Sequence, residues 1–543
     1  MFRELVQTIS RREWQLVAVI SGLVMAATIA PILYGWLVTP PSHVFTAMHF
    51  VSADDWFVYY MFIDQASQGS LLLSDLYAAI PHTPVVRPVW TLVGWVGGLL
   101  RVGPPVAFQL VRLALIPIFF CATYLFLAAV FSQERVRKLS LVFLAASSGF
   151  GFFFIHRLVQ NPLNYNRGAF QWPMDLWVPD INTFLTLHTS PHFIAATILL
   201  LVIFLQLLLF LRRPLWRYAI VAGLGGGLLF LIHPFQIVKI FAILGVFGIM
   251  RCLALGRIER KLAGFGAIFL GLSSPAIGYY VWLLRTDHLT LLRTLQNINP
   301  STPPWLTLVA LGGLGIGAVA GLTLLIRRRQ LIDPAMLLLA VWAVVQFGLL
   351  YAPLSYQRRM ALGFHVPLVC LTVIALVAAQ SRWPGQVKKF LPQLVMLGIL
   401  LFLPSSMFAL AADVMVFQQA RELSYLHIDE KHALDWLRQE SPTGSVVYSA
   451  VKTGLVLPAY SLRSSYVGHA VETPDYVGRK LEPNWFFAVD RPEEIERAYL
   501  ERRGINYLWY GRREQELGTF NPAMKNYLEP VVELPTVTLY QVL

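Results

Sequence analysis

Apolar runs of about 20 residues recur along most of this sequence, and they limit its fold more than any other feature. A run of that length can cross the hydrocarbon core of a bilayer as a single α-helix. Charged residues form 13% of the chain, about half the share that is usual in soluble globular domains. The sequence therefore predicts a polytopic α-helical membrane protein and excludes a soluble, disordered or collagen-like chain.

Basic residues flank these runs in six clusters, which the positive-inside rule assigns to the cytoplasmic side. The clusters are Arg3/Arg11/Arg12, Arg135/Arg137/Lys138, Arg212/Arg213/Arg217, Arg251/Arg257/Arg260/Lys261, Arg327/Arg328/Arg329 and Arg382/Lys388/Lys389. An even number of spans must separate neighbouring clusters, and about eleven transmembrane helices meet this condition. We expect them at residues 15–37, 105–131, 139–157, 191–211, 218–233, 235–251, 262–284, 305–326, 334–352, 360–380 and 391–412.

This topology divides the chain into a multi-span membrane domain, residues 1–422, and a soluble extracytoplasmic α/β domain, residues 423–543. The N-terminus is expected in the cytoplasm and the C-terminal domain outside. The net charge of +13 arises from the cytoplasmic clusters, so it does not indicate a nucleic-acid partner. No Asn-x-Ser/Thr glycosylation acceptor occurs, which favours a prokaryotic protein of the plasma (inner) membrane.

The first outer loop contains adjacent carboxylates, Asp54 and Asp55, followed by four aromatic residues within five positions. The apolar spacing over residues 55–68 predicts a helix along the membrane surface, and the short run 89–100 predicts a second interfacial helix. One hypothesis is a general base that deprotonates an acceptor hydroxyl. The other is a helix N-cap, because Asp in that position satisfies free backbone N–H groups.

The second outer loop adds polar candidates for substrate or metal binding. They are Asp180, His188 and His192, joined by His233 between two later spans. Carboxylate and imidazole groups can hold a divalent cation, although their spacing matches no standard ligand motif. The alternative is that these residues and their aromatic neighbours form an ordinary membrane-interface belt. The metal, and any cofactor, stays unknown from the sequence.

The segment PLSYQRRMALGFHVP places Arg358 and Arg359, with Tyr356, on the expected outer side at the start of a span. Two guanidinium groups at a helix start oppose the helix dipole and call for a compensating anion. Arginine suits bidentate contact with phosphate, so a lipid phosphate is one interpretation. A salt bridge to a loop aspartate, or contact with ordinary anionic membrane lipid, is the other.

These features together resemble the GT-C-type integral-membrane glycosyltransferases: a first span, an acidic outer loop with interfacial helices, many further spans and an outer C-terminal domain. The resemblance implies transfer of a hexose or pentose from a polyprenyl-phosphate-linked donor to an acceptor hydroxyl at the outer face. It assigns catalysis to Asp54 or Asp55 and the donor phosphate to Arg358 and Arg359. The acceptor, a lipid, glycan or protein, stays open.

Two other classes are consistent with a polytopic chain. A transporter or flippase of a lipid-linked or small anionic substrate predicts internal repeats and broken helices at mid-membrane. A scaffold that presents the C-terminal domain to a partner would leave the outer aspartates and arginines without a joint purpose. The sequence has no GxxxxGK[ST] motif and no GxGxxG turn, which argues against an ATP-driven transporter.

Overall fold

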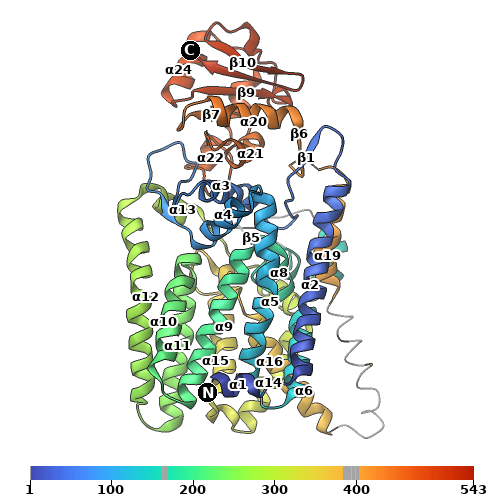
Figure 1. Cartoon of the computed structure of the whole chain (residues 1–543), viewed down its shortest axis with the longest axis vertical. Coiled ribbons are helices and arrows are strands. Elements are labelled where there is room, and N and C mark those ends of the chain that lie inside the picture. The colour runs from blue at the N-terminus through green and yellow to red at the C-terminus, as the bar shows by residue number, and fades with distance from the viewer. Residues whose placement is uncertain are drawn as a thin grey trace. The chain divides into compact units, whose positions relative to one another are not determined.

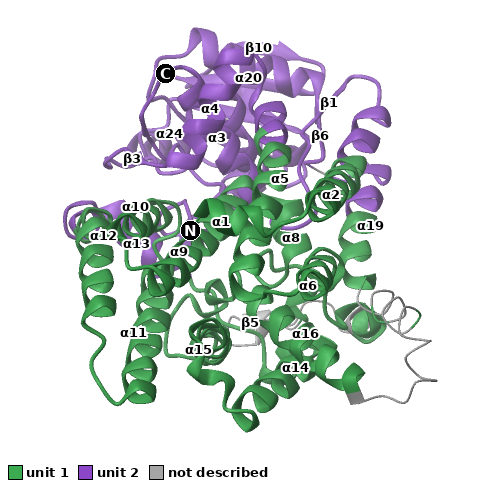
Figure 2. Cartoon of the chain, turned by 60° about the horizontal axis from the view of Figure 1, so that its bottom comes forward, with its two compact units in different colours: residues 1–31, 111–281, 298–412 green, residues 32–110, 282–297, 413–543 purple. Residues whose placement is uncertain are grey.

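The computed structural model describes residues 2–159, 165–166, 169–170, 172–382, 393, 398, 403–421 and 423–543. These residues fall into two compact units, each assembled from segments that are far apart in the sequence (Figure 2). Unit 1 holds residues 1–31, 111–281 and 298–412. Unit 2 holds residues 32–110, 282–297 and 413–543.

Seven helical segments among the described residues are long and apolar enough to cross a membrane. They are α2 (Arg11–Leu37), α5 (Pro104–Val130), the segment Glu134–Arg157, α9 (Pro191–Arg212), α11 (Gln236–Leu255), α12 (Arg260–Thr286) and α14 (Pro304–Arg327). Four shorter apolar helices are α4 (Pro88–Leu100), α10 (Trp216–Ile232), α15 (Pro334–Leu349) and α16 (His365–Arg382). The predicted polytopic α-helical fold is confirmed.

Two predicted spans differ in detail from the structure. The segment Glu134–Arg157 is not one regular helix, because α6 (Glu134–Ala146) ends before η1 (Gly151–Phe154) and α7 (Ile155–Val159). The span expected at 360–380 begins later, at His365, after the 3-10 turn η4 (Gln357–Ala361). The span expected at 391–412 lies largely outside the described residues, which show α19 (Pro404–Gln418) near its end.

The long helices of unit 1 run side by side (Figure 1) and pack closely where glycines allow it. A Cβ atom on Gly321 of α14 would lie 2.0 Å from the carbonyl oxygen of Leu371 in α16. One turn earlier, a Cβ on Gly317 would lie 2.5 Å from the Thr372 side chain. Small residues four positions apart let membrane helices approach closely, so these glycines have a packing role.

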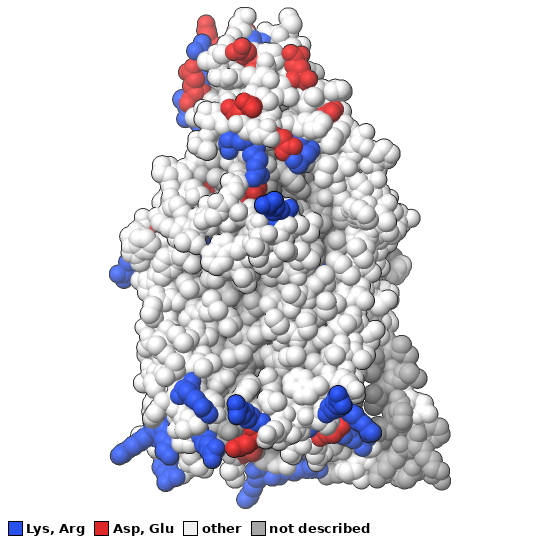
Figure 3. Space-filling view, viewed as in Figure 1, with Lys and Arg blue, Asp and Glu red and all other residues white. Residues whose placement is uncertain are grey.

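Basic side chains of unit 1 gather at one end of its helices, at the bottom of the view in Figure 3. Among the described residues, five of the six predicted clusters have exposed members, including Arg3, Arg135, Arg213, Arg257 and Arg327–Arg329. Clustering at one end of the bundle is the pattern that the positive-inside rule requires of residues on one side of a membrane.

Unit 2 contains a mixed five-stranded sheet in the order β10-β11-β9-β7-β8. The strands are β7 (Val446–Tyr448), β8 (Ser464–Ser465), β9 (Tyr507–Gly511), β10 (Leu528–Leu534) and β11 (Val537–Val542). Strand β7 is parallel to β8 and β9, whereas β11 is antiparallel to β9 and β10. The predicted α/β character of the C-terminal region is confirmed.

Six helices flank this sheet among the described residues. They are α20 (Ile428–Glu440), α21 (Val451–Ser461), α22 (Tyr476–Arg479), α23 (Glu482–Ala488), α24 (Glu493–Arg502) and α25 (Arg512–Gln515). The aromatic side chains of Tyr448, Phe486 and Phe487 are buried in one core between sheet and helices.

The first loop joins the C-terminal segment within unit 2. Strand β1 (His43–Phe45) pairs antiparallel with β6 (Tyr425–His427), so that His43 lies opposite His427. Helix α3 (Asp55–Ser67) is covered by protein on nearly all sides and packs against α4 and α21. Helix α4 instead exposes Leu92, Trp95 and Leu99, as expected of an interfacial helix.

The remaining short elements are α1 (Phe2–Gln7), β2 (Leu72–Leu73), β3 (Val85–Val86), β4 (Tyr165–Asn166), β5 (Ala169–Phe170), η2 (Met174–Leu176), α8 (Thr183–Thr189), α13 (His288–Gln296), η3 (Gln330–Ile332) and η5 (Pro522–Met524).

Candidate active site

The two adjacent aspartates of the first loop open helix α3 without capping it. Asp54 already has helical backbone angles, with φ −70° and ψ −35°, and its side chain makes no capping hydrogen bond. Asp55 is the first residue of the helix proper. The N-cap interpretation is therefore wrong for Asp54, and both carboxyl groups need another explanation.

Asp55 is paired with a histidine from the C-terminal segment. Its Oδ1 lies 3.1 Å from Nε2 of His469. The other ring nitrogen, Nδ1, accepts backbone N–H groups from Glu472 at 3.2 Å and Val471 at 3.3 Å. Because Nδ1 is an acceptor, we assign the ring proton to Nε2, which donates to Asp55. The hydrogen bond leaves Oδ2 of Asp55 available to a substrate.

Close backbone packing fixes the loop that carries His469. A Cβ on Gly454 of α21 would lie 1.9 Å from the carbonyl oxygen of Val467. On the loop's other side, the Gln296 side-chain amide donates to the carbonyl oxygens of Val471 at 3.2 Å and Thr473 at 3.0 Å. The loop therefore holds the His469 imidazole rigidly against Asp55, which favours a defined orientation of the Asp55 carboxylate.

A buried ionic cluster lies next to this loop. Arg293 of α13 forms an ion pair with Glu472 and lies 3.6 Å from Oδ2 of Asp75. Burial raises the pKa of Asp75 from its ordinary value of 3.8 to about 8, and the Glu472 charge adds to this effect. Burial would also raise the pKa of Glu472, but the Arg293 guanidinium holds it near 2. The carboxyl pair thus keeps one proton and one negative charge at neutral pH.

Asp54 differs electrostatically from its neighbour. Its residue surface is exposed, yet surrounding protein atoms desolvate the carboxyl group and raise its pKa. The nearby charge of Asp55 adds to the rise, whereas His469 and Lys452 oppose it. Unit 2 therefore presents one carboxylate oriented by a hydrogen bond and a second that resists ionisation.

A separate polar cluster lies within unit 1. The guanidinium of Arg359 is 3.5 Å from Oδ2 of Asp180, which is buried. Lys239 of α11 is also buried and donates to the Leu362 carbonyl oxygen at 2.5 Å. Burial raises the pKa of Asp180, whereas Arg359, Lys239 and Arg358 lower it. Three cations thus surround one carboxyl group, and this net positive charge suits an anionic ligand.

The two arginines occupy the turn η4 rather than the first turn of a span. Their expected place at a helix start is therefore wrong, and the helix-dipole argument for an anion does not apply. Arg358 stacks 4.6 Å above the Trp177 ring, and its guanidinium donates to Oδ1 of Asn299 at 2.5 Å. Tyr356 packs against Phe235, with ring centroids 4.8 Å apart. The contacts with Trp177 and Asn299 fix the orientation of the Arg358 side chain. Nε of Arg359 is buried without a hydrogen-bond partner among the described residues.

Only part of the predicted histidine group comes together. The rings of His192 and His233 stack with centroids 5.0 Å apart. His188 is buried and stacks on Phe184 instead. Since Asp180 already faces cations, its surroundings disfavour a metal ion there.

Arg293, Asp75, His469 and Glu472 are not among the site residues that the sequence predicts. Arg293 had one local signal, because it is a positive charge in a loop that the topology puts outside. That is the signal that singled out Arg358 and Arg359. The other three residues follow no motif, and only the fold brings them together.

Similar solved structures identify the fold. The mycobacterial arabinofuranosyltransferase AftD matches with a TM-score of 0.55 and 16% identity, over 98% of this chain and 40% of its own. The apo oligosaccharyltransferase of Archaeoglobus fulgidus matches with a TM-score of 0.54 and 14% identity, over 92% of this chain and 70% of its own. ArnT of Cupriavidus metallidurans, bound to undecaprenyl phosphate, matches with a TM-score of 0.52 and 14% identity, over 98% of each chain. The chain has the GT-C fold.

The GT-C likeness extends over both units, because these matches cover nearly the whole chain. Another structure of the archaeal enzyme is a complex with Zn and sulfate, and a further one holds an inhibitory peptide and a dolichol-phosphate. No model of a protein family matches the sequence, and no curated protein matches it.

Proposed function

We propose that this protein is a membrane glycosyltransferase that moves a sugar from a polyprenyl-phosphate-linked donor to an acceptor hydroxyl. The observation that carries the proposal is the hydrogen-bonded pair of Asp55 and His469 beside the uncapped Asp54, in a chain with the GT-C fold. Carboxyl groups with unlike surroundings are typical of sites that perform acid-base chemistry on sugars.

In the proposed reaction, Oδ2 of Asp55 removes the proton from the acceptor hydroxyl. The acceptor oxygen forms a bond to the anomeric carbon as the bond from that carbon to the donor's phosphate oxygen breaks. The polyprenyl phosphate leaves as an anion and takes the bonding electron pair. His469 acts as a positioning residue, because its Nε2–H holds Oδ1 of Asp55 and so turns Oδ2 outward.

The donor's phosphate needs a separate set of cations. Arg358, Arg359 and Lys239 supply positive charge in unit 1, and Asp180 orients Arg359 through their ion pair. A phosphate would also give the buried Nε of Arg359 an acceptor. This chemistry agrees with ArnT, whose structure holds undecaprenyl phosphate.

The cellular setting follows from the expected topology. We propose a multi-pass protein of the plasma membrane, with its N-terminus in the cytoplasm and residues 423–543 outside. A lipid-linked donor then explains how transfer proceeds at the outer face without a nucleotide-binding domain. The acceptor is a lipid, a glycan or a protein, and the sugar is a hexose or pentose.

A transporter of a lipid-linked anion is the second candidate, and one observation favours it. Helix α6 is interrupted after Ala146, and α14 has non-helical angles at Gly312, with φ 52° and ψ −141°. The two interruptions meet, since the Phe150 N–H donates to the Val309 carbonyl oxygen at 2.9 Å. Broken helices are common in transporters, where the freed backbone groups usually line a substrate path. Here, by contrast, backbone groups of the two interruptions form a hydrogen bond with each other.

Single substitutions test the catalytic assignment. Asp55→Asn keeps the shape and an acceptor for His469 but removes the base, so transfer should fall by about 10²- to 10⁴-fold. Asp54→Asn tests the neighbouring carboxyl group in the same way, and Asp435→Asn on the surface of α20 is the matched control. Full activity in both Asp54→Asn and Asp55→Asn would refute the assignment.

A further inference from the structure

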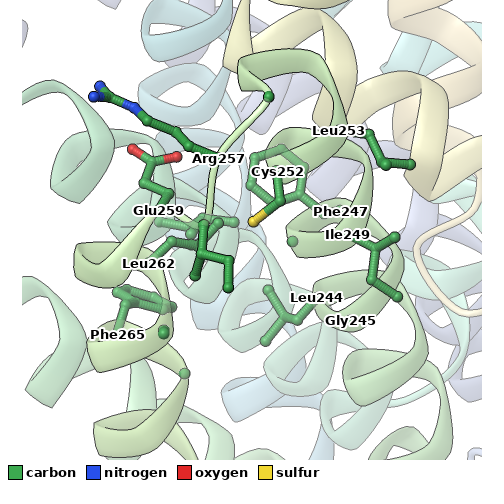
Figure 4. Close-up of a pocket in the computed structure, with 16 residues that line it drawn as sticks. Leu244, Gly245, Phe247, Ile249, Cys252, Leu253, Arg257, Glu259, Leu262 and Phe265 are labelled. Carbon is green, nitrogen blue, oxygen red and sulfur yellow. The ribbon is translucent and has the colours of Figure 1, made fainter.

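A cavity lies at the basic end of unit 1, between α11, α12 and the turn that joins them (Figure 4). Its volume is about 710 Å³, within the range of about 300–1,000 Å³ that is typical of ligand sites. The lining is almost entirely apolar and includes Leu244, Phe247, Ile249, Leu253, Leu262 and Phe265. This composition suits a hydrocarbon ligand rather than a soluble metabolite.

Glycines of α11 and α12 contribute to the space of this cavity. Gly245 and Gly248 of α11 and Gly266 of α12 line the cavity, and a Cβ atom on any of them would meet nothing within 4 Å. Close helix packing therefore does not explain these glycines, in contrast to Gly317 and Gly321. Glycine is a poor helix former. Three glycines without close neighbours around one cavity therefore indicate that the cavity has a function, such as holding a ligand.

One uncompensated positive charge stands at the cavity's polar end. Glu259 is paired with Arg251 at 3.1 Å, and Arg251 also donates to the Ile332 carbonyl oxygen at 2.9 Å. The exposed guanidinium of Arg257 has neither an ion pair nor a hydrogen bond within the part of the chain that the structure describes. Arginine in this setting suits a phosphate group.

We propose that this cavity binds an acyl chain of one anionic glycerophospholipid, with the lipid's phosphate on Arg257. The apolar lining takes the hydrocarbon chain, and the unpaired guanidinium takes the headgroup at the membrane surface. A free phosphate would leave the apolar space unused, and a zwitterionic lipid would offer Arg257 a phosphate that its own cation already compensates. The sequence topology assigns this end to the cytoplasmic side, opposite to Arg358 and Arg359, so the site is independent of the proposed donor site.

Native mass spectrometry of the full-length protein tests the proposal, with phosphatidylglycerol, phosphatidylcholine and undecaprenyl phosphate as probes. We expect one phosphatidylglycerol to stay bound, and the double substitution Gly245→Leu/Gly248→Leu to remove it by filling the cavity. Gly271→Leu is the matched control, because Gly271 of α12 also faces open space but does not line the cavity. Arg257→Gln should weaken phosphatidylglycerol about tenfold, whereas Arg260→Gln should not.

Cys252 gives a second measurement that does not depend on the leucine variants. With Cys121 and Cys370 replaced by Ser, phosphatidylglycerol should slow the labelling of Cys252 by an apolar maleimide, and phosphatidylcholine should do so less. Equal lipid retention by the cavity-filling variant and the wild type would overturn the proposal. Preferential binding of undecaprenyl phosphate, or labelling that no lipid slows, would also overturn it.

Discussion

Replacing His469 by Ala removes the group that orients the proposed base, and the structure indicates how much this should cost. The hydrogen bond to Asp55 is 3.1 Å long, and the histidine side chain is 6% exposed, whereas the aspartate side chain is 31% exposed. Hydrogen bonds to charged groups contribute about 1.5–3 kcal/mol. Water reaches Asp55, so we take the lower end, about 1.5 kcal/mol, which corresponds to about a tenfold loss of kcat/KM.

The assay is a double-mutant cycle on purified protein, with release of polyprenyl phosphate from a labelled donor as the readout. His469→Ala should lower kcat/KM about tenfold in the wild type but less than about twofold in the Asp55→Asn background, where nothing is left to orient. His469→Gln should recover part of the loss, because the Gln amide can still donate.

The control is His432→Ala, which removes an exposed histidine of α20 and should leave the rate unchanged. If His469→Ala costs as much with Asn at position 55 as with Asp, the histidine does not act through that residue. In that case the positioning role is refuted even if the enzyme is a glycosyltransferase.

Burial raises the pKa of Asp75 to about 8, so the folded protein holds a proton that the unfolded chain releases above about pH 4. The unfolding temperature of the protein should therefore fall as pH rises from 5 to 8, and Asp75→Asn should remove most of this pH dependence. The same pH dependence in wild type and Asp75→Asn would contradict the raised pKa of Asp75. Arg359→Gln should weaken polyprenyl-phosphate binding about tenfold, whereas Arg328→Gln should not affect binding. EDTA should leave this binding intact, because side-chain cations carry the charge, and loss on chelation would show that a metal contributes. Gly454→Ala places a Cβ 1.9 Å from a loop carbonyl and should destabilise the protein by about 1–3 kcal/mol, whereas Gly22→Ala meets open space and should be neutral.

The sequence predicted the membrane helices well because their signal is local. Length and apolar composition alone decide whether a segment such as 191–211 crosses a bilayer, and α9 matches that range closely. The start of α16 was missed because Gly363 has a φ of +76°, which keeps the preceding turn from continuing into the helix. Hydropathy does not report such a break, since the residues on both sides of it are apolar.

The sequence predicts those residues of the candidate site that have a local signal, but not those that only a long-range contact brings to it. Asp54 and Asp55 can be recognised from the local sequence, because two adjacent charges before an apolar helix are unusual. His469 is 414 positions from its partner Asp55, and no periodicity or spacing reports a contact of that range. The proton shared by Asp75 and Glu472 depends on burial and on Arg293, which only the folded chain supplies.

The central claim is sugar transfer from a lipid-linked donor, and donor turnover tests it most directly. Purified protein in nanodiscs is incubated with a panel of radiolabelled polyprenyl-phosphate sugars, beside an Arg358→Ala/Arg359→Ala variant of matched thermal stability. We predict release of polyprenyl phosphate from at least one donor by the wild type and its loss in the double variant. Intact binding of the donors without turnover of any of them, or equal turnover by the double variant, would contradict it.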